Sequence, residues 1–369
     1  MLLKRLKIYL HNYSDKGCLG KEQGKSVSIC FSIAQRREPN FYLDDPMAEN
    51  NKNKKEESKK LTSIPVHDIK LKKGITVEGL FGEMEHIGGF SAQHMITGTH
   101  IIDDMLKDKK SFNFLSFPAD IVSTGLRGVL ASMTKHFNAI ITTGGTVDHD
   151  LARAFGGKYS LGTFNADDAY LHSLKVYRLG NVFIENDEYG LKVEESFRKI
   201  MDDIYSSKDY KKEYSASELL YEFGKHIKDE GSILRQAYLH NVKIFNPGIL
   251  DGAFGTQLTI YSQDHDFKLN LIRDELELSN ISFDNKVTGA LMIGGGISKH
   301  HVIWWNQFKG GLDYAVYITT ATQFDGSLSG ARLTEAVSWG KIKEKAKYVT
   351  IDGDATIILP FMMSALGME

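Results

Sequence analysis

Seven short, almost continuously apolar runs set the possible folds of this chain, and several of them are followed by a glycine-rich turn. Such runs are typical of strands buried on both faces of a parallel sheet, because a strand with one wet face alternates apolar and polar residues. Amphipathic stretches at 126–137 and 215–241 predict helices that cover the sheet. The predicted fold class is α/β, with a doubly wound, mostly parallel sheet and helices on both faces. The runs span 112–122, 139–145, 181–186, 242–248, 289–296, 314–321 and 348–360.

A charged run, AENNKNKKEESKK at 48–60, divides the chain. It has too little apolar surface to order itself, so we predict a disordered linker there. Residues 1–47 before it show little periodicity. The chain is therefore predicted to have an N-terminal extension and linker over 1–60, followed by a single domain over 61–369.

Composition narrows the possible partners and the location. The net charge is −2, which gives no overall field for nucleic acid or for a membrane surface. No run reaches the roughly 18–20 apolar residues that span a bilayer, and residues 1–10 lack the apolar core of a signal peptide. Cys18 and Cys30 are the only cysteines, so the main domain has neither a disulfide framework nor a cysteine metal site. We expect a cytoplasmic protein.

Three glycine-rich turns, at 141–152, 291–301 and 351–356, each follow an apolar run and lead into a helix. Glycine lets the backbone approach a ligand, and a helix N-terminus offers free N–H groups to phosphate. Strand-to-helix turns also use glycine for steric reasons alone, and none of the three has the G-x-G-x-x-G or Walker pattern. A nucleotide site and a purely steric role both stay open, with Asp354 a candidate partner for a ribose hydroxyl.

The adjacent pair His300–His301 and three tryptophans, Trp304, Trp305 and Trp339, mark the last quarter of the chain. Neighbouring residues on a helix point about 100° apart, so the two histidines cannot bind one ion together, and we expect no metal. One histidine is expected to be structural and the other functional. The tryptophans either pack in the core or line an aromatic slot for an aliphatic cation.

Lys341 directly follows Trp339–Gly340 in the stretch EAVSWGK. A free lysine has a pKa near 10.4, so about one amine in a few thousand is the nucleophilic free base at pH 7. Enclosure beside tryptophan would lower that pKa and activate the amine for imine chemistry. The alternative is an ordinary solvated surface lysine.

Several motifs, taken in order, resemble those of the deoxyhypusine synthase family, and the resemblance runs from about residue 75 to the C-terminus. The resemblance implies a Rossmann-like, NAD-binding catalytic domain. The motifs are STGLR (123–127), TTGG (142–145), NVFIENDEY (181–189), FNPGILDG (245–252), GGGISKHH (294–301), DYAVYITTA (313–321), FDGS (324–327), SGAR (329–332), EAVSWGKI (335–342) and DGDAT (352–356).

The resemblance also implies an activity. Members oxidise spermidine with NAD, carry the butylamine group as an imine on an enzyme lysine, and transfer it to a lysine of the hypusine-bearing translation factor. Lys341 matches the imine-forming lysine, and His300 matches the histidine that handles protons. Members are tetramers with active sites at subunit interfaces, so a homotetramer is expected.

The remaining site residues follow from the same resemblance. Positions implied in polyamine binding are Asp148, His149, Trp304, Tyr317, Asp325, Glu335 and Trp339. Positions implied in NAD binding are Ala119, Asp120, Ser123, Thr143, Gly144, Gly145, Asp251, Gly295, Thr320, Ala321, Asp354 and Ala355.

Four positions depart from the family pattern. His149, Thr256 and Leu328 stand where members usually have acids, and Trp304 stands where asparagine is common. Lost carboxylates remove charge-assisted hydrogen bonds to a polycation. This pattern resembles the deoxyhypusine-synthase-like branch. Two alternatives therefore stay open: a homospermidine synthase-like enzyme with a free diamine as acceptor, and a catalytically idle NAD-binding paralogue or regulatory subunit.

Overall fold

The computed structural model describes residues 57–368 of the chain. Contacts divide the chain into two units, Met1–Pro65 and Val66–Glu369. Of the first unit only residues 57–65 are described, and residues 57–61 form a short helix with exposed side chains. The other residues of the predicted extension and linker lie outside the described range.

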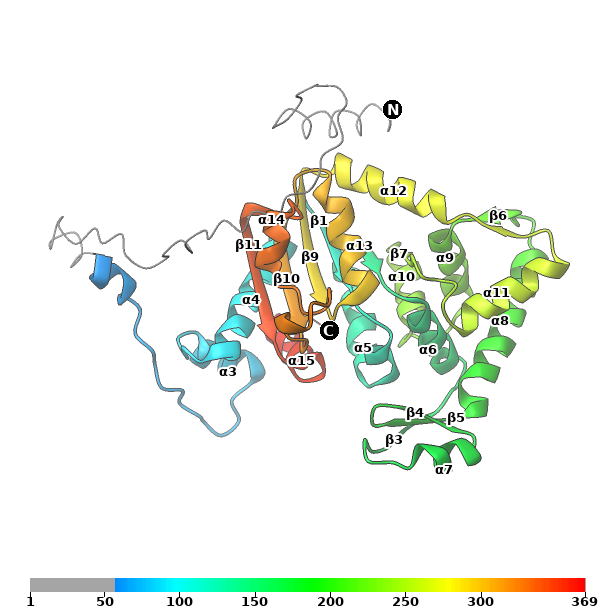
Figure 1. Cartoon of the computed structure of the whole chain (residues 1–369), viewed down its shortest axis with the longest axis horizontal. Coiled ribbons are helices and arrows are strands. Elements are labelled where there is room, and N and C mark those ends of the chain that lie inside the picture. The colour runs from blue at the N-terminus through cyan, green and yellow to red at the C-terminus, as the bar shows by residue number, and fades with distance from the viewer. Residues whose placement is uncertain (1–56, 369) are drawn as a thin grey trace, which may run out of the picture. The chain divides into compact units, whose positions relative to one another are not determined.

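A six-stranded parallel sheet is the centre of the second unit, in the order β11-β10-β9-β1-β2-β7 (Figure 1). The predicted α/β class is confirmed. Chain order reverses between β1 and β9, and ligands of open α/β sheets bind beyond the carboxyl ends of the strands at such a point. The strands are β1 (Ser111–Ser116), β2 (Ala139–Ile141), β7 (Lys243–Phe245), β9 (Val287–Ile293), β10 (Leu312–Thr319) and β11 (Ile342–Asp352).

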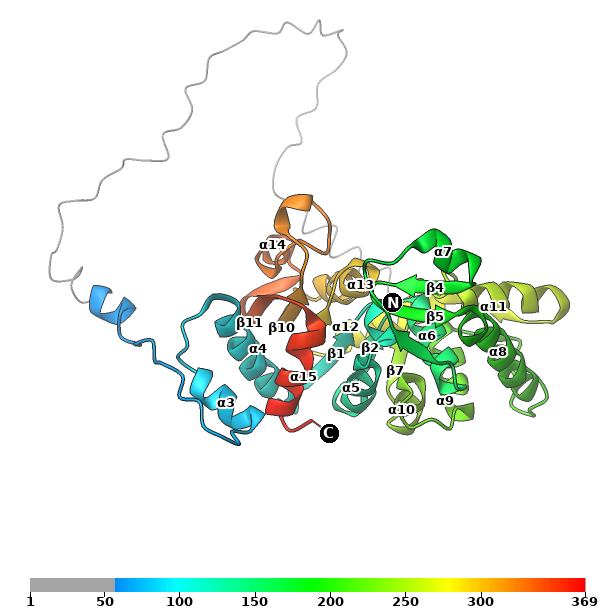
Figure 2. The ribbon, with the colours of Figure 1, turned by 90° about the horizontal axis from the view of Figure 1, so that it is seen from below.

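Helices cover both faces of this sheet, as Figure 2 shows. One face packs against α4 (Phe90–Lys107), α5 (Leu126–Met133) and α15 (Ala355–Ala365), and the other against α13 (Gly296–Gln307) and α14 (Leu333–Ser338). Further helices are α3 (Val77–Met84), α6 (Gly144–Ala154), α7 (Asp168–Ser173), α8 (Gly190–Tyr205), α9 (Ala216–His226), α10 (Ile233–Leu239), α11 (Ala253–Asp264) and α12 (Leu271–Asp284).

Neighbouring strand residues belong to different cores. Leu115 and Leu291 lie in the cluster on the α4 face, whereas Phe114 and Met292 lie in the cluster on the α13 face. Successive side chains of a strand point to opposite faces, so a sheet covered on both sides needs apolar residues at every position. This is why these runs read as continuously apolar in the sequence.

The run at 181–186 is a strand, but it is not part of the parallel sheet. It forms β5 (Val182–Glu185), which pairs antiparallel with β3 (Tyr159–Leu161) and β4 (Val176–Leu179). With α7 (Asp168–Ser173), these strands make an insertion between α6 and α8 (Figure 1). Only Ile184 of β5 is buried. A strand of four residues is too short to show the alternation of apolar and polar residues that marks a sheet with one face in solvent.

The two ends of this insertion lie together. The backbone N–H of Lys158 donates to Glu188 Oε2 at 2.9 Å. A Cβ on Gly157 would lie 2.5 Å from the carbonyl oxygen of Glu188, so only glycine fits there. The chain therefore leaves and rejoins the main fold at one point.

The amphipathic stretch 215–241 forms two helices, α9 and α10, rather than one. A capping box of Ser215 and Glu218 starts α9, and α9 ends before residues 227–232. Ser232 caps α10, and its hydroxyl donates to the buried carboxylate of Asp150 at 2.7 Å. Asp150 is 82 residues upstream. The start of α10 is therefore fixed by a tertiary contact, which a local sequence pattern cannot show.

Residues 213–214 and 268–269 form the short parallel pair β6 (Glu213–Tyr214) and β8 (Lys268–Leu269).

Gly98 lets α4 lie close against the sheet. A Cβ there would lie 2.7 Å from Ile351 Cδ1 and 3.3 Å from Val316 Cγ1. We expect Gly98→Val to lower the free energy of unfolding by about 1–3 kcal/mol, because overpacking forces side chains or the helix to shift. Chemical denaturation measures the effect. Gly82→Val on the exposed face of α3, where nothing lies within 4 Å, is the control, and equal loss in both variants would contradict the prediction.

Candidate functional site

The turns after β1, β2 and β9 lie against one another at the carboxyl edge of the sheet. A Cβ on Gly145, after β2, would lie 2.9 Å from the Cβ of Ala119, after β1. One on Gly294, after β9, would lie 3.0 Å from Pro118 Cγ. These turns therefore meet at the point where the strand order reverses, with glycine where the backbones approach most closely.

Two uncapped helix N-termini face this region. α6 begins at Gly144 and α13 at Gly296, and neither has a side-chain hydrogen bond to its first N–H groups. Free N–H groups and the positive end of a helix dipole attract anions. The arrangement fits a phosphate-bearing ligand.

The predicted NAD-binding residues surround the same edge. Asp120, Asp251, Thr320 and Asp354 are exposed, which leaves their oxygens accessible to ribose hydroxyls. Asp354 also caps α15, accepting from the N–H of Thr356 at 2.8 Å. Of the other predicted NAD-binding residues two are buried, Ser123 and Gly144, and the rest are half-buried: Ala119, Thr143, Gly145, Gly295, Ala321 and Ala355. Ser123, Thr356 and Tyr159 line a cavity of about 320 Å³ next to this edge.

Lys341 and His300 form a second group, on the α13 face of the sheet. Gly340, in the left-handed region with φ 67°, turns the chain after α14. The Lys341 ammonium then lies 5.2 Å from the ring of Trp339. Burial lowers the pKa of Lys341, and the charge of Glu335 opposes that shift. Burial and the charge of Lys341 lower the pKa of His300, so the two side chains lie within electrostatic range.

Two of the three tryptophans face solvent. Trp339 is 62% exposed and Trp304 is 39% exposed, and Trp304 stacks on His300 with ring centroids 5.6 Å apart. Core packing is thus the wrong interpretation for these two. Trp305 packs against the core, and its indole donates to Glu275 at 2.9 Å.

The two predicted substrate-binding acids of the last quarter of the chain are accessible. Glu335 is exposed on α14, and Asp325 is exposed with Oδ1 accepting from the N–H of Ser327 at 2.7 Å. Tyr317 is different, because it is fully buried and its hydroxyl donates to the Ser329 carbonyl at 2.6 Å. A direct contact between Tyr317 and substrate does not fit this geometry.

Asp148 and His149 are buried beside the insertion. Asp148 accepts from the N–H groups of Ala253 and Phe254 at 2.9 and 2.7 Å, so it caps α11. His149 Nδ1 lies 2.8 Å from the Tyr159 hydroxyl. The ring of His149 also packs on that of Tyr189 at 5.1 Å. Both predicted substrate-binding side chains are thus already engaged within the chain.

Burial lowers the pKa of His149 to about 4 from 6.5. Between these pH values the unfolded chain binds a proton that the folded chain does not, so stability falls as pH drops from about 6.5 to 4. The expected loss is about 3 kcal/mol. Denaturation of the wild type and of His149→Gln across pH 4–7 checks this, and the variant should have the flatter profile. Parallel profiles would contradict the prediction.

Two of the other departures from the family pattern, Thr256 and Leu328, have neutral side chains. The Thr256 hydroxyl donates to the Gly252 carbonyl at 3.0 Å, within its own helix. The Leu328 carbonyl accepts from the Lys299 ammonium at 3.0 Å. Neither residue places a negative charge where an acid would have stood.

The backbone of Lys341 lies at the amino edge of the sheet, whereas the glycine turns and the first turn of α13, which carries His300, lie at the carboxyl edge. Lys341 precedes β11, and its carbonyl accepts from the N–H of Leu312 at the start of β10. The glycine turns follow their strands instead. Among residues 57–368, no hydrogen bond or ion pair joins Lys341 to those turns. α13 connects the groups, because it begins at Gly296 in the turn after β9 and carries His300.

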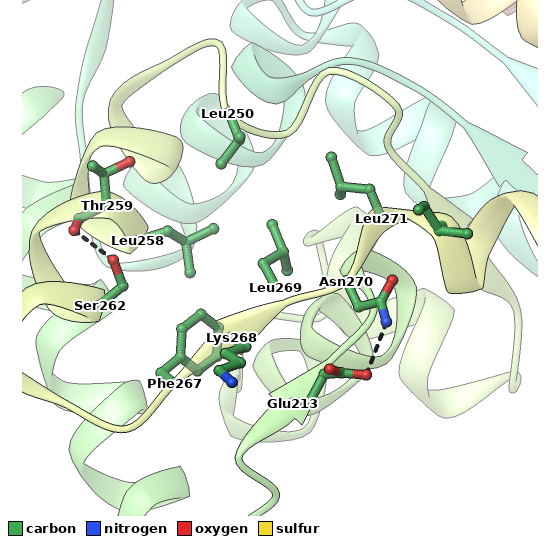
Figure 3. A pocket seen from close by; sticks show the side chains of 11 residues that line it. Glu213, Leu250, Leu258, Thr259, Ser262, Phe267, Lys268, Leu269, Asn270 and Leu271 are labelled. Carbon is green, nitrogen blue, oxygen red and sulfur yellow. Dashed lines mark hydrogen bonds between the residues drawn. The ribbon is translucent and has the colours of Figure 1, made fainter.

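The cavity drawn in Figure 3 is a separate feature. It has a volume of about 650 Å³ and is lined mainly by apolar side chains such as Leu258, Phe267 and Leu269. Its Glu213 accepts from Asn270 at 2.9 Å. It contains none of the predicted site residues and no cluster of titratable groups, so it offers no site for the predicted chemistry.

One residue that the sequence did not indicate is Lys299, which is buried beside His300. Its neighbours come from a segment some 30 residues later, so no local pattern could show its burial.

Within the described part of the chain, no helix is long and apolar enough to cross a membrane. In the same part, no group of three or more His, Cys, Asp or Glu side chains is arranged to hold a metal.

Together, fold and site define a doubly wound α/β protein with a phosphate-compatible crevice and a partly buried amine on one face. The family model of deoxyhypusine synthase matches residues 79–366. A protein of Sulfurisphaera tokodaii named "Probable deoxyhypusine synthase" is 52% identical over 302 residues, which cover 80% of this chain and 96% of that protein. One of Thermoplasma volcanium with the same name is 50% identical over 309 residues, covering 83% and 98%.

A crystal structure from Entamoeba histolytica, described as a "putative deoxyhypusine synthase", has the same fold. It matches with a TM-score of 0.59 and 21% identity, over 82% of this chain and 96% of that one. On the family model and the relatives of about 50% identity, the chain belongs to the deoxyhypusine synthase family.

Proposed function

We propose that this protein is an NAD-dependent aminobutyl transferase. Its donor is spermidine or a related polyamine, and its acceptor is a lysine of the hypusine-bearing translation factor. Family membership supports the reaction type. The observation that carries the proposal is the Lys341 amine, half-buried beside Trp339 with its pKa lowered by burial.

The carboxyl edge of the sheet would hold the dinucleotide. The uncapped N-termini of α6 and α13 would face its phosphates, and the exposed acids Asp120, Asp251 and Asp354 would face its hydroxyl groups. When bound, NAD would supply the hydride chemistry that oxidation of the donor and reduction of the final product require.

Lys341 would carry the transferred group. Its lowered pKa increases the fraction of free amine, which would attack the C=N carbon of the oxidised donor and release the fragment that carries that nitrogen as a free amine. A lysine of the acceptor then displaces Lys341 in the same way. His300, whose own pKa is lowered, would take and return the protons of these exchanges.

The neighbours of Lys341 suit an aliphatic cation. The exposed faces of Trp304 and Trp339 offer apolar and cation–π contact, and Glu335 offers a carboxylate to an ammonium group. His149, Thr256 and Leu328 add no negative charge, so a donor of lower charge than spermidine also fits the proposal.

Two copies would complete one site. The family resemblance implies tetramers with active sites at subunit interfaces, and soluble homo-oligomers usually have closed symmetry. We therefore propose a homotetramer with shared sites. We also propose that the protein works in the cytoplasm.

The test is to incubate the protein with NAD and a panel of polyamines, add borohydride, and locate any adduct by mass spectrometry. An adduct on Lys341 that depends on NAD and on one donor is the expected result. Acceptor assays with the translation factor and with free diamines then distinguish two activities: modification of a protein lysine and homospermidine-type synthesis. NAD binding without an adduct from any amine would overturn the proposal and leave the idle paralogue.

A further inference from the structure

Lys299 is a buried cation with neutral partners. Its side chain is 1% exposed, and its ammonium donates to the carbonyl oxygens of Leu328 at 3.0 Å and Ala331 at 2.7 Å. It also lies 3.8 Å from the ring centroid of Tyr317. Burying an ammonium is costly unless hydrogen bonds and a facing ring replace its water. The proposed reaction gives this residue no task, so its burial calls for another explanation.

All these partners hold one segment, residues 322–332, which we call the clamped segment. The Ser329 carbonyl accepts from the Tyr317 hydroxyl at 2.6 Å and from the Thr319 hydroxyl at 3.2 Å. Carbonyls 328, 329 and 331 are thus each bound by a side chain from β10 or α13. Gly330 packs so tightly that a Cβ would lie 1.9 Å from the Thr322 carbonyl oxygen.

The clamped segment leads directly into the residues around Lys341. α14 begins at Leu333, carries Glu335 and ends before Trp339, Gly340 and Lys341. Residues 322–327 of the segment are exposed, so its hold on the fold comes from positions 328–332, where Arg332 also forms an ion pair with Asp352. A shift there would move α14 and the amine that follows it.

We propose that Lys299 is a positioning residue: its ammonium holds the clamped segment against β10 and so sets where Glu335 and Lys341 lie relative to His300. The effect on amine chemistry rests on the proposed function, whereas the clamp itself does not. Burial lowers the pKa of Lys299 to about 8, with Glu335 raising it and Arg332 and Lys341 lowering it further. The charge–dipole contribution to the clamp is therefore strongest below that pH.

The experiment compares Lys299→Met with Lys309→Met. Lys309 is the matched control: its side chain is 7% exposed, its pKa is also lowered to about 8, and it binds Asp313 and Asn285 rather than the clamped segment. Hydrogen exchange of residues 328–341 and acetylation of Lys341 across pH are measured for each. Neither readout needs a donor or a cofactor.

In Lys299→Met we expect exchange over 328–341 to rise about tenfold or more, since local opening becomes easier. The acetylation profile of Lys341 should move toward that of an exposed lysine. Borohydride trapping should fall about 10²-fold, as a misplacement of about 1 Å can cost that much. Lys309→Met should change none of the three.

If Lys299→Met does not fold, Lys299→Gln, which keeps a hydrogen-bond donor without the charge, replaces it. A folded variant with wild-type exchange and wild-type acetylation overturns the clamp. A wild-type protein that never forms an adduct overturns the proposed function instead, and the exchange and acetylation results still decide the clamp.

Discussion

Lys341→Ala is expected to abolish the borohydride-trapped adduct and to reduce turnover by about 10³-fold or more. The reason is that removal of a covalent nucleophile removes the reaction path rather than weakening it. Mass spectrometry of the trapped protein measures the adduct, and a coupled assay of NADH formation measures the oxidation.

Two controls make this result specific. Lys341→Arg keeps the cation beside Trp339 but cannot form an imine at neutral pH, so it should be as inactive as the alanine variant. Lys345→Ala removes an exposed lysine of β11, the strand that follows Lys341, and should behave as the wild type. If the Lys341→Ala variant formed as much adduct as the wild type, the imine would have to form on another lysine.

Asp150→Ala is expected to cause the largest loss of stability, about 3–5 kcal/mol, which is roughly 5–10 °C in Tm for a domain of this size. Asp150 is fully buried and accepts from Arg127 Nε at 2.7 Å. It also accepts from the Ser232 hydroxyl and from the N–H groups of Ile233 and Leu234 at the start of α10. Its removal leaves the buried guanidinium of Arg127 without one of its carboxylate partners. It also leaves the first N–H groups of α10 without a hydrogen-bond acceptor.

Calorimetry or chemical denaturation measures this loss. The control is Asp168→Ala, which breaks an exposed ion pair with Arg178 and should leave stability unchanged. If the two variants were equally stable, the buried network would contribute little and the ordering of α10 would need another cause.

The parallel sheet could be predicted because burial on both faces leaves an unambiguous apolar record. The insertion could not, since β5 is a strand of four residues with a single buried side chain. The break within 215–241 was also hidden, because Asp150 and not a local turn signal fixes the start of α10. In each case the structure depends on a contact with residues far along the chain, which a local sequence pattern cannot show.

The candidate site shows the same division. The environment of Lys341 follows from its immediate neighbours Trp339 and Gly340, so the sequence could indicate it. The roles of Asp148 and Tyr317 depend on α11 and on the clamped segment, and both side chains prove to be engaged within the fold. The burial of Lys299 has the same origin.

The insertion between α6 and α8 has a consequence for how such a protein can diverge. Since its ends meet at Gly157 and Glu188, its length and sequence can change without altering any span that the sheet must bridge. Yet it supplies Tyr159, the hydrogen-bonding partner of His149. Replacement of this insertion can thus change the surroundings of that histidine while the parallel sheet stays as it is, so the two parts of the chain can diverge separately.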